Sequence, residues 1–206
     1  MIADEKQILR SLMRTRLAGG NVEENRDRSK RLRTHLFQTP AYARARVVYG
    51  FSPLASEPDW SGGELPADKI WGFPRMRVIP ALGGPLSTLE FLRVRSFAEL
   101  EPRRWGLCEP PDDAEVAPPP DLIFVPGLAF DAQGGRLGRG KGFYDAALGR
   151  LPGFRLGICF DSQRVPLVPT APHDQRVQAI LTESGLWEVP AMTSLAGRPA
   201  RSSAAM

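Results

Sequence analysis

A short apolar run that opens directly into a glycine-rich, basic segment constrains this chain more than any other feature. Residues 122–125 are apolar and are followed by Pro126-Gly127, which predicts a buried strand with an abrupt end. Five of the nine residues from 134 to 142 are glycine, and a helix is predicted to begin at Phe143. The order strand, glycine loop, helix is typical of α/β proteins, which bind ligands at the carboxyl ends of parallel strands.

Three cations lie within the glycine segment, namely Arg136, Arg139 and Lys141. Because glycine has no Cβ, the backbone N–H groups of such a loop can close around an anion, and the N-terminus of the following helix adds partial positive charge. We therefore predict that the ligand is a phosphate chain. The alternative is a long glycine turn with solvated arginine side chains.

The segment departs from two common phosphate-binding loops. Residues 135–141 have the spacing of a Walker A loop, but Gly142 stands where that loop has the Ser or Thr that holds Mg²⁺. The dinucleotide-binding pattern fails as well, because Phe143 stands where a third glycine or an alanine is expected. If a metal accompanies the phosphates, the nearest carboxylate that could bind it is Asp145.

The rest of the chain predicts helices that alternate with strands. One helix is expected from Asp4 to the Gly19-Gly20 pair, a second over residues 29–38, and a third from Phe143 to about Gly149. Strands are expected at residues 47–49, 69–73, 76–79, 88–97, 122–125, 154–160 and 177–182. This alternation predicts a three-layer α/β/α fold with a mainly parallel sheet, mixed at the edge where residues 88–97 are expected to run antiparallel. We expect one domain over residues 1–190 and a disordered tail over residues 191–206.

The composition excludes several classes of protein. No apolar run approaches the roughly 20 residues of a membrane span, and the first residues are too polar for a signal peptide, so a cytoplasmic location is expected. Two cysteines are too few for a disulfide scaffold. The net charge of +4 does not come from one long basic block, so we expect no nucleic-acid partner. A basic RNA-associated protein is the alternative, and it predicts steeply salt-dependent binding to RNA.

Lysine is scarce, with four residues beside 23 arginines, and Lys6 and Lys141 are candidates for point charges on a phosphate. Lys6 and Arg10 stand four residues apart on the first predicted helix, so both could reach one anion. A solvated helix edge is the alternative. Phe51, Trp60 and Trp71 are aromatic candidates for a ligand pocket, with a place in the core as the alternative.

Two adjacent stretches carry a resemblance to a known family. The run RLGRGKGFYD at residues 136–145, preceded by DLIFVPGLAFD at residues 121–131, resembles the hallmark of the 5-formyltetrahydrofolate cyclo-ligase (methenyltetrahydrofolate synthetase) family. The resemblance extends more weakly to Lys6 and Arg10 and to His173-Asp174, and so covers residues 5–183. It implies conversion of 5-formyltetrahydrofolate to 5,10-methenyltetrahydrofolate with ATP and Mg²⁺, through phosphorylation of the formyl oxygen and release of ADP and phosphate.

The resemblance also implies the residues of the site. Those expected to bind ATP are Lys6, Arg10, Arg136, Leu137, Gly138, Arg139, Gly140, Lys141, Gly142, Phe143 and Tyr144. Those expected to bind the folate substrate are Glu57, Arg75, Arg139, Gly140, Lys141, Phe143 and Tyr144. Arg139, Lys141 and Tyr144 are expected to be catalytic, and Asp145 and Asp174 to hold Mg²⁺.

The chain departs from the family pattern at a few positions. Glu57 is followed by Pro58, Gly62-Gly63 interrupt the helix that the family usually starts nearby, and Phe143 replaces the commoner Tyr. Without the resemblance, His173-Asp174 beside Pro172 would be interpreted as a turn. The altered stretch after Glu57 motivates a second hypothesis, a non-catalytic folate- or nucleotide-binding protein of the same fold. A monomer with a small-molecule substrate and no membrane partner is expected.

Overall fold

The protein is described here by a computed structural model of residues 1–79, 86–103 and 106–190. The predicted tail, residues 191–206, lies outside the described residues. The helices are α1 (Ile2–Ala18), α2 (Val22–Gln38), α3 (Pro40–Arg44) and α4 (Phe143–Leu148). The strands are β1 (Val47–Tyr49), β2 (Ile70–Ile79), β3 (Leu86–Val94), β4 (Glu101–Pro102), β5 (Cys108–Glu109), β6 (Leu122–Val125), β7 (Ala129–Phe130), β8 (Arg136–Leu137), β9 (Phe154–Ile158), β10 (Ala179–Thr182) and β11 (Gly185–Glu188).

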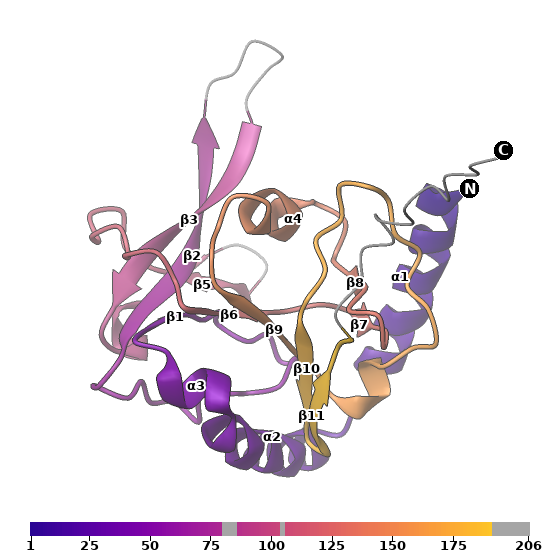
Figure 1. Cartoon of the computed structure of the whole chain (residues 1–206), viewed down its shortest axis with the longest axis horizontal. Coiled ribbons are helices and arrows are strands. Elements are labelled where there is room, and N and C mark those ends of the chain that lie inside the picture. The colour runs from indigo at the N-terminus through magenta and orange to yellow at the C-terminus, as the bar shows by residue number, and fades with distance from the viewer. Residues whose placement is uncertain (80–85, 104–105, 191–206) are drawn as a thin grey trace, which may run out of the picture.

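A seven-stranded sheet in the order β11-β10-β9-β6-β1-β2-β3 forms the centre of the molecule (Figure 1). The five inner strands pair in parallel, and the edge strands β3 and β11 are antiparallel to their neighbours. The predicted α/β fold with a mainly parallel, mixed sheet is therefore confirmed. The sequence analysis foresaw the antiparallel strand β3 and missed β11.

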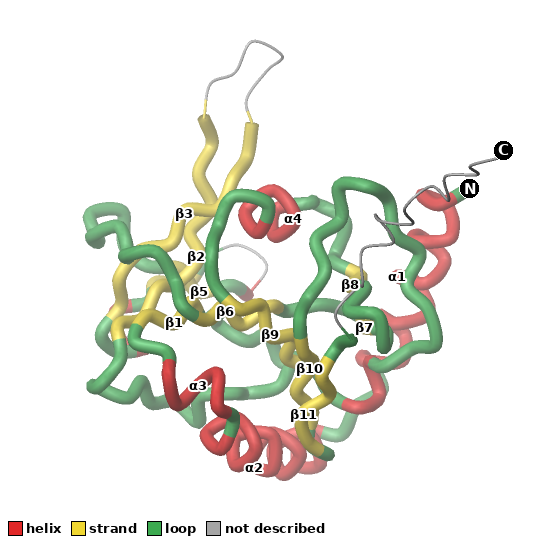
Figure 2. The backbone as a smooth tube through the Cα atoms, in the orientation of Figure 1, coloured by secondary structure: helices red, strands yellow, loops and turns green. Residues whose placement is uncertain are grey.

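Helices cover both faces of the sheet, as apolar side chains on both faces of its inner strands require. One core cluster joins α2 and α3 to the sheet through Leu32, Leu36 and Tyr42. The other joins α4 to the opposite face through Ala147 and Leu148. On the side of α4 the chain runs mainly as loops and turns (Figure 2). This is the side where the predicted site residues gather.

Two predicted helix starts were wrong. α1 begins at Ile2 instead of Asp4, and α2 begins at Val22, seven residues before the predicted start. The side-chain oxygen of Asn21 accepts a hydrogen bond from the backbone N–H of Glu23, which satisfies one of the free donors at the start of α2. The predicted end of α2 before Pro40 is correct.

The break predicted in the second strand does not exist, because β2 runs through Pro74 without interruption. β1 pairs with β2 only as far as Tyr49 opposite Gly72. Since Pro74 lies beyond this pairing, its missing N–H leaves no hydrogen bond to β1 unmade. Among the described residues, no helix is long and apolar enough to cross a membrane.

Candidate active site

The glycine-rich segment forms two separate structures, a hairpin turn and the loop that follows it. Its first part is the turn of a hairpin in which β7 pairs with β8, so Gly134 and Gly135 do not belong to the phosphate loop that was predicted. The buried carboxylate of Asp131 holds this turn, accepting hydrogen bonds from the backbone N–H groups of Gln133 and Gly135. The same carboxylate accepts one from Val168, which ties the hairpin to a distant part of the chain.

The second part, residues 138–142, is the loop that connects β8 to α4 and passes between two cavities. Gly140 and Gly142 have φ angles of +107° and +70°, which side chains with a Cβ rarely adopt. Helix α1 lies against this loop: Arg10 donates from Nε to the Gly138 carbonyl at 3.1 Å, and Arg14 donates to the Arg139 carbonyl at 3.2 Å. The N-terminal helix therefore fixes the loop from one side.

The cavity on the α1 side has a volume of about 520 Å³ and is basic. It is lined by Lys6, Arg10, Arg136, Leu137, Gly138, Gly140, Gly142, Asp145, Ala146, Gly149, Arg150, His173, Asp174 and Gln175. We call it the basic pocket. It brings together residues from the two ends of the chain and from the glycine loop, as the sequence analysis predicted for a phosphate site.

Two ion pairs compensate charge inside the basic pocket. Lys6 Nζ lies 2.5 Å from Asp174 Oδ2, and Arg136 Nη2 lies 2.8 Å from Asp145 Oδ1. Only 3% of the Arg136 side chain and about a tenth of the Lys6 and Asp174 side chains are exposed. Two of the cations expected to hold phosphate, Lys6 and Arg136, thus pair with the carboxylates that were expected to hold Mg²⁺.

The pKa of Asp174 lies below its ordinary value. Burial acts to raise it, but the hydrogen bonds from Lys6 and from the Ala171 N–H, together with the positive charge of Lys6, outweigh that effect. Asp174 is therefore a carboxylate throughout the neutral range, and it sits in a turn, as its sequence context also allowed.

The donor set suits Mg²⁺, which commonly takes one or two carboxylates together with phosphate oxygens and water. Asp145 Oδ1 accepts from Arg136 and from the Gln175 N–H, and Asp174 Oδ2 accepts from Lys6 and Ala171. The second oxygen of each carboxylate accepts no hydrogen bond from the described part of the chain. Within that part, no group of three or more His, Cys, Asp or Glu residues forms a site made of protein ligands alone.

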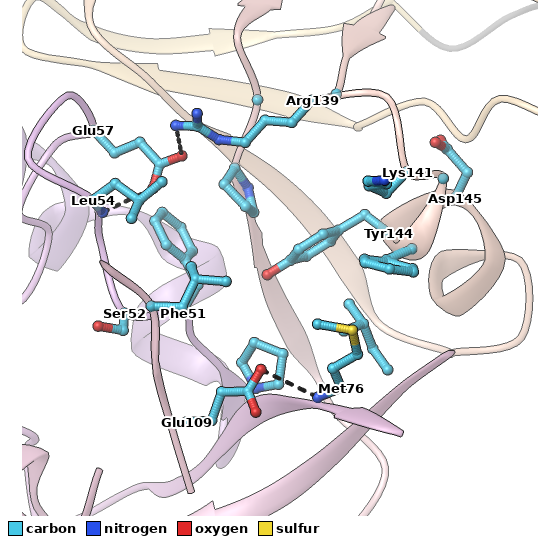
Figure 3. Close-up of a pocket in the computed structure, with 18 of the residues that line it drawn as sticks. Phe51, Ser52, Leu54, Glu57, Met76, Glu109, Arg139, Lys141, Tyr144 and Asp145 are labelled. Atoms are coloured by element: carbon cyan, nitrogen blue, oxygen red, sulfur yellow. Dashed lines mark hydrogen bonds and ion pairs between the residues drawn. The ribbon is translucent and has the colours of Figure 1, made fainter. Parts of the chain in front are cut away.

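The cavity on the other side of the glycine loop has a volume of about 400 Å³ and is mostly apolar (Figure 3). We call it the apolar pocket. Its apolar lining includes Phe51, Leu54, Pro74, Met76, Leu89, Leu107, Pro126 and Phe143. Its polar side chains include Ser52, Glu57, Glu109, Arg136, Arg139, Lys141, Tyr144 and Asp145. A large apolar cavity with a few polar groups is typical of a site for a small organic ligand.

An ion pair connects the glycine loop to the far wall of the apolar pocket. Arg139 Nη2 lies 3.0 Å from Glu57 Oε1, and the other oxygen of Glu57 accepts from the Leu54 N–H (Figure 3). The Glu57 side chain is 8% exposed and that of Arg139 is 44% exposed. Glu57 thus reaches the site although the residues after it break the expected helix.

Tyr144 enters the apolar pocket from α4, and its hydroxyl is directed into the cavity (Figure 3). This hydroxyl is buried and has no hydrogen-bond partner among the described residues. Burial raises its pKa, the negative charge of Glu57 raises it further, and Arg136 opposes these effects only in part. Tyr144 therefore remains a neutral phenol that can donate a hydrogen bond to a ligand.

The two pockets divide most of the predicted site residues between them. Arg136, Gly138, Gly142 and Asp145 line both. Lys6, Arg10, Leu137, Gly140 and Asp174 line the basic pocket only, whereas Glu57, Arg139, Lys141, Phe143 and Tyr144 line the apolar pocket only.

Arg75 does not line either pocket, so its predicted role in substrate binding finds no support. Its neighbours Pro74 and Met76 face the apolar pocket, and alternation along β2 turns Arg75 to the other side. There its buried guanidinium donates to the Pro110 carbonyl and pairs with Asp112. Of the aromatic candidates, Phe51 lines the pocket, while Trp60 and Trp71 are buried in the core.

The sequence analysis missed several residues of both pockets. Met76, Leu89 and Glu109 line the apolar pocket, and Arg150 and Gln175 line the basic one. The alternation of residues 74–76 could have indicated Met76 once β2 was recognised as continuous. No signal in the sequence pointed to Glu109, since it lies at the start of the acidic, proline-rich connection at residues 109–120.

Comparisons with known proteins found similar sequences and a similar fold. The model of the 5-formyltetrahydrofolate cyclo-ligase family matches residues 2–183. A 5-formyltetrahydrofolate cyclo-ligase of Mus musculus is 28% identical in an alignment of 192 residues that covers 86% of this chain and 93% of the relative. One of Escherichia coli is 28% identical over 185 residues, 86% of this chain and 100% of the relative. A solved structure of Aquifex aeolicus 5,10-methenyltetrahydrofolate synthetase has a TM-score of 0.75 at 26% identity, covering 95% of this chain and 98% of that one.

Proposed function

The chain belongs to the 5-formyltetrahydrofolate cyclo-ligase family, and from that premise we propose that it uses ATP and Mg²⁺ to convert 5-formyltetrahydrofolate to 5,10-methenyltetrahydrofolate, releasing ADP and phosphate. The observation that carries the proposal is the loop of residues 138–142, which forms one wall of a basic pocket and one wall of an apolar pocket. A phosphoryl group and an organic acceptor can meet at such a shared wall.

The reaction must overcome a poor leaving group, because the oxygen of a formamide does not depart as hydroxide at neutral pH. In the proposed route the formyl oxygen attacks the γ-phosphorus of ATP, and ADP leaves. The neighbouring anilino nitrogen then adds to the activated formyl carbon and loses its proton. Phosphate departs with the former formyl oxygen, which leaves the cyclic methenyl product. The protein needs no nucleophilic side chain for these steps, and its main tasks are positioning and charge stabilisation.

In this proposal the phosphates occupy the basic pocket, where Lys6, Arg10 and Arg136 provide positive charge. Lys6 and Arg136 also pair with the carboxylates of Asp174 and Asp145. Both cations could contact phosphate, and the two carboxylates would be the residues that hold Mg²⁺. Mg²⁺ held by Asp145 and Asp174 would neutralise charge on the terminal phosphates during transfer.

The folate ring occupies the apolar pocket, with its formyl group at the glycine loop. Arg139 and Lys141 belong to the glycine loop, and both line this pocket. They would therefore stabilise negative charge on the oxygens of the phosphoryl group as it transfers. The hydroxyl of Tyr144, which has no hydrogen-bond partner among the described residues, can donate a hydrogen bond to the formyl oxygen or, after transfer, to the phosphoryl group. Phe143 and the apolar lining provide flat contact surface for the ring.

The test is formation of the methenyl product from 5-formyltetrahydrofolate, followed by its near-ultraviolet absorbance. Product must depend on both ATP and Mg²⁺, and one ADP must form for each methenyl product. Reactions without nucleotide, and without Mg²⁺ in the presence of a chelator, are the controls. Tight folate binding without product would instead favour the non-catalytic binding protein. The motive for that alternative is weaker now, because Glu57 lines the apolar pocket despite the altered residues that follow it.

A further inference from the structure

The apolar pocket contains three carboxylates, and they differ in how their charge is compensated. Glu57 pairs with Arg139 at 3.0 Å, and Asp145 pairs with Arg136 at 2.8 Å. For Glu109, no ion pair occurs within the described part of the chain. Its one hydrogen bond there is a long one of 3.4 Å, from the backbone N–H of Met76 to Oε1. A half-buried carboxylate among apolar side chains that lacks a cation is a strong acceptor available to a ligand.

The backbone around Glu109 is held in place from two sides. Glu109 belongs to β5, where it pairs with Glu101 of β4. The following residue, Pro110, accepts a hydrogen bond from the buried guanidinium of Arg75, which also pairs with Asp112. This clamp explains why Arg75 is buried although it does not line the pocket. It makes Arg75 a positioning residue for the wall that carries Glu109.

Glu109 lies across the apolar pocket from the cations of the glycine loop (Figure 3). The pocket is therefore polarised, with Arg139 and Lys141 on one wall and, on the opposite wall, a carboxylate that has no ion-pair partner within residues 1–79, 86–103 and 106–190. A ligand that fits both ends is flat and apolar in the middle, carries an oxygen or phosphoryl group at one end, and has N–H donors at the other. A reduced pteridine with a formyl group on N5 has this polarity, because its N3–H and 2-amino donors lie on the ring away from N5.

We propose that Glu109 is a specificity residue for the substrate, accepting two parallel hydrogen bonds from the N3–H and 2-amino groups of the pteridine ring. Two carboxylate oxygens match such a pair of donors in the same way that they match the fork of an arginine. This inference rests on the proposed function. It adds that the protein recognises the end of the pteridine ring that carries N3–H and the 2-amino group, and that Glu109 recognises it.

Glu109→Gln tests the inference with little change of shape. The amide keeps one acceptor but presents NH₂ donors where the ligand also has donors, so one hydrogen bond is lost and a repulsive contact replaces it. We expect the dissociation constant and the KM for 5-formyltetrahydrofolate to rise about tenfold to a hundredfold. The KM for ATP and the midpoint of thermal unfolding are expected to stay near those of the wild type. Glu101→Gln is the matched control, because it removes the same charge from the paired strand outside the pocket, and it should leave folate binding unchanged.

A modified ligand shows whether Glu109 recognises the 2-amino group or whether its substitution disturbs the whole pocket. The probe is 5-formyltetrahydrofolate in which a methyl group replaces the 2-amino group. Wild-type protein should bind this probe at least tenfold more weakly than 5-formyltetrahydrofolate. Glu109→Gln should discriminate between the two ligands much less, because the acceptor that distinguishes them is gone. Equal discrimination by both proteins would overturn the inference.

The outcomes also separate this inference from the proposed function. If the wild type neither binds 5-formyltetrahydrofolate nor forms the methenyl product, the proposed function fails, and the inference fails with it. If the wild type binds and turns over the substrate while Glu109→Gln has an unchanged KM for it, only the assignment of Glu109 fails.

Discussion

The two pockets on either side of the glycine loop differ in how many of their polar side chains already have a partner within the protein. In the basic pocket, Lys6 and Arg136 are each paired with a carboxylate. In the apolar pocket, the hydroxyl of Tyr144 and the carboxylate of Glu109 have no strong partner among the described residues. Lys6 and Arg136 can therefore bind an anion only by leaving or sharing a carboxylate partner, whereas Tyr144 and Glu109 present polar groups that are ready for a ligand.

This difference suits the ligands that we assign to the pockets. Pairing with Asp174 and Asp145 offsets the repulsion between the positive charges of Lys6 and Arg136 while both remain in one pocket. A flat organic ring gains affinity mainly from apolar burial, and a few unpaired polar groups fix its orientation. The loop of residues 138–142 separates these two environments, and the following experiments test whether that separation is real.

The largest effect is expected from Lys141→Ala. Lys141 lines only the apolar pocket, so its charge should act on the transferring phosphoryl group and not on nucleotide binding. We expect kcat to fall about 100- to 1000-fold, with the KM for ATP nearly unchanged. Steady-state kinetics with both substrates would measure this. Lys30→Ala is the control, because Lys30 is exposed on α2 and Asp27 is its one ion-pair partner among the described residues. Wild-type turnover in Lys141→Ala would remove Lys141 from the mechanism.

Asp174→Asn tests the partner exchange in the basic pocket. The change removes the carboxylate that we propose as a Mg²⁺ ligand and leaves Lys6 without its ion-pair partner, so we expect the KM for ATP to rise about tenfold to a hundredfold. The KM for folate should change little. Calorimetric titration with ATP at low and high Mg²⁺ would show whether the loss depends on the metal. Lys6→Ala in the Asp174→Asn background should cost less than Lys6→Ala alone. Equal losses for folate and ATP would contradict the division between the pockets.

A smaller effect is expected from Tyr144→Phe, which removes one hydroxyl and keeps the ring. Loss of one hydrogen bond should lower kcat/KM for folate about twofold to tenfold. Because burial and the charge of Glu57 raise the pKa of Tyr144, its hydroxyl should remain protonated at pH 10, where an ordinary tyrosine is half ionised.

The stabilising effect of the neutral phenol is complete below pH 10 and is lost as the pH rises toward the higher pKa of the folded state. The ratio of wild-type to Tyr144→Phe activity should therefore stay constant between pH 8 and pH 10. A fall in this ratio toward pH 10 would show that Tyr144 ionises in the folded protein.

The smallest effect on binding is expected from Arg75→Leu, which alters the support of the apolar pocket and not its lining. Loss of the hydrogen bond to the Pro110 carbonyl should lower the free energy of unfolding by about 1–3 kcal/mol. The midpoint of thermal unfolding should fall by about 2–4 °C for each kcal/mol, while the KM for folate rises no more than a few-fold. Arg93→Leu is the control, since Arg93 pairs at 3.7 Å with an exposed glutamate. A large rise in KM without loss of stability would return Arg75 to the list of substrate residues.

Strands whose apolar pattern is purely local were predicted correctly from the sequence. Residues 122–125 and 154–160 were predicted as buried parallel strands because their apolar runs are continuous, and β6 and β9 lie there. The failures came where a local signal had to be weighed against packing. Pro74 was interpreted as the end of a strand, because the sequence does not show that β1 stops before reaching it.

The glycine-rich segment shows the same limit. Its composition predicted one phosphate loop, but Gly134 and Gly135 lie in a hairpin turn that the Asp131 carboxylate holds through the Gly135 N–H and ties to the distant Val168. Because residues 129–137 form the hairpin, the part of the segment that lies between the pockets is the loop of residues 138–142.

The sequence by itself determined the class of fold and the family, and it pointed to the segment to which we assign the chemistry, since apolar periodicity and a long specific motif are both local properties of the chain. Only the tertiary structure decided which side of the glycine loop each residue faces. That choice depends on contacts between distant residues, such as the bond from Arg10 to Gly138, 128 positions apart, and on whether alternation along β2 turns a side chain toward the pocket. Residue spacing contains neither fact, because both arise from how the elements pack.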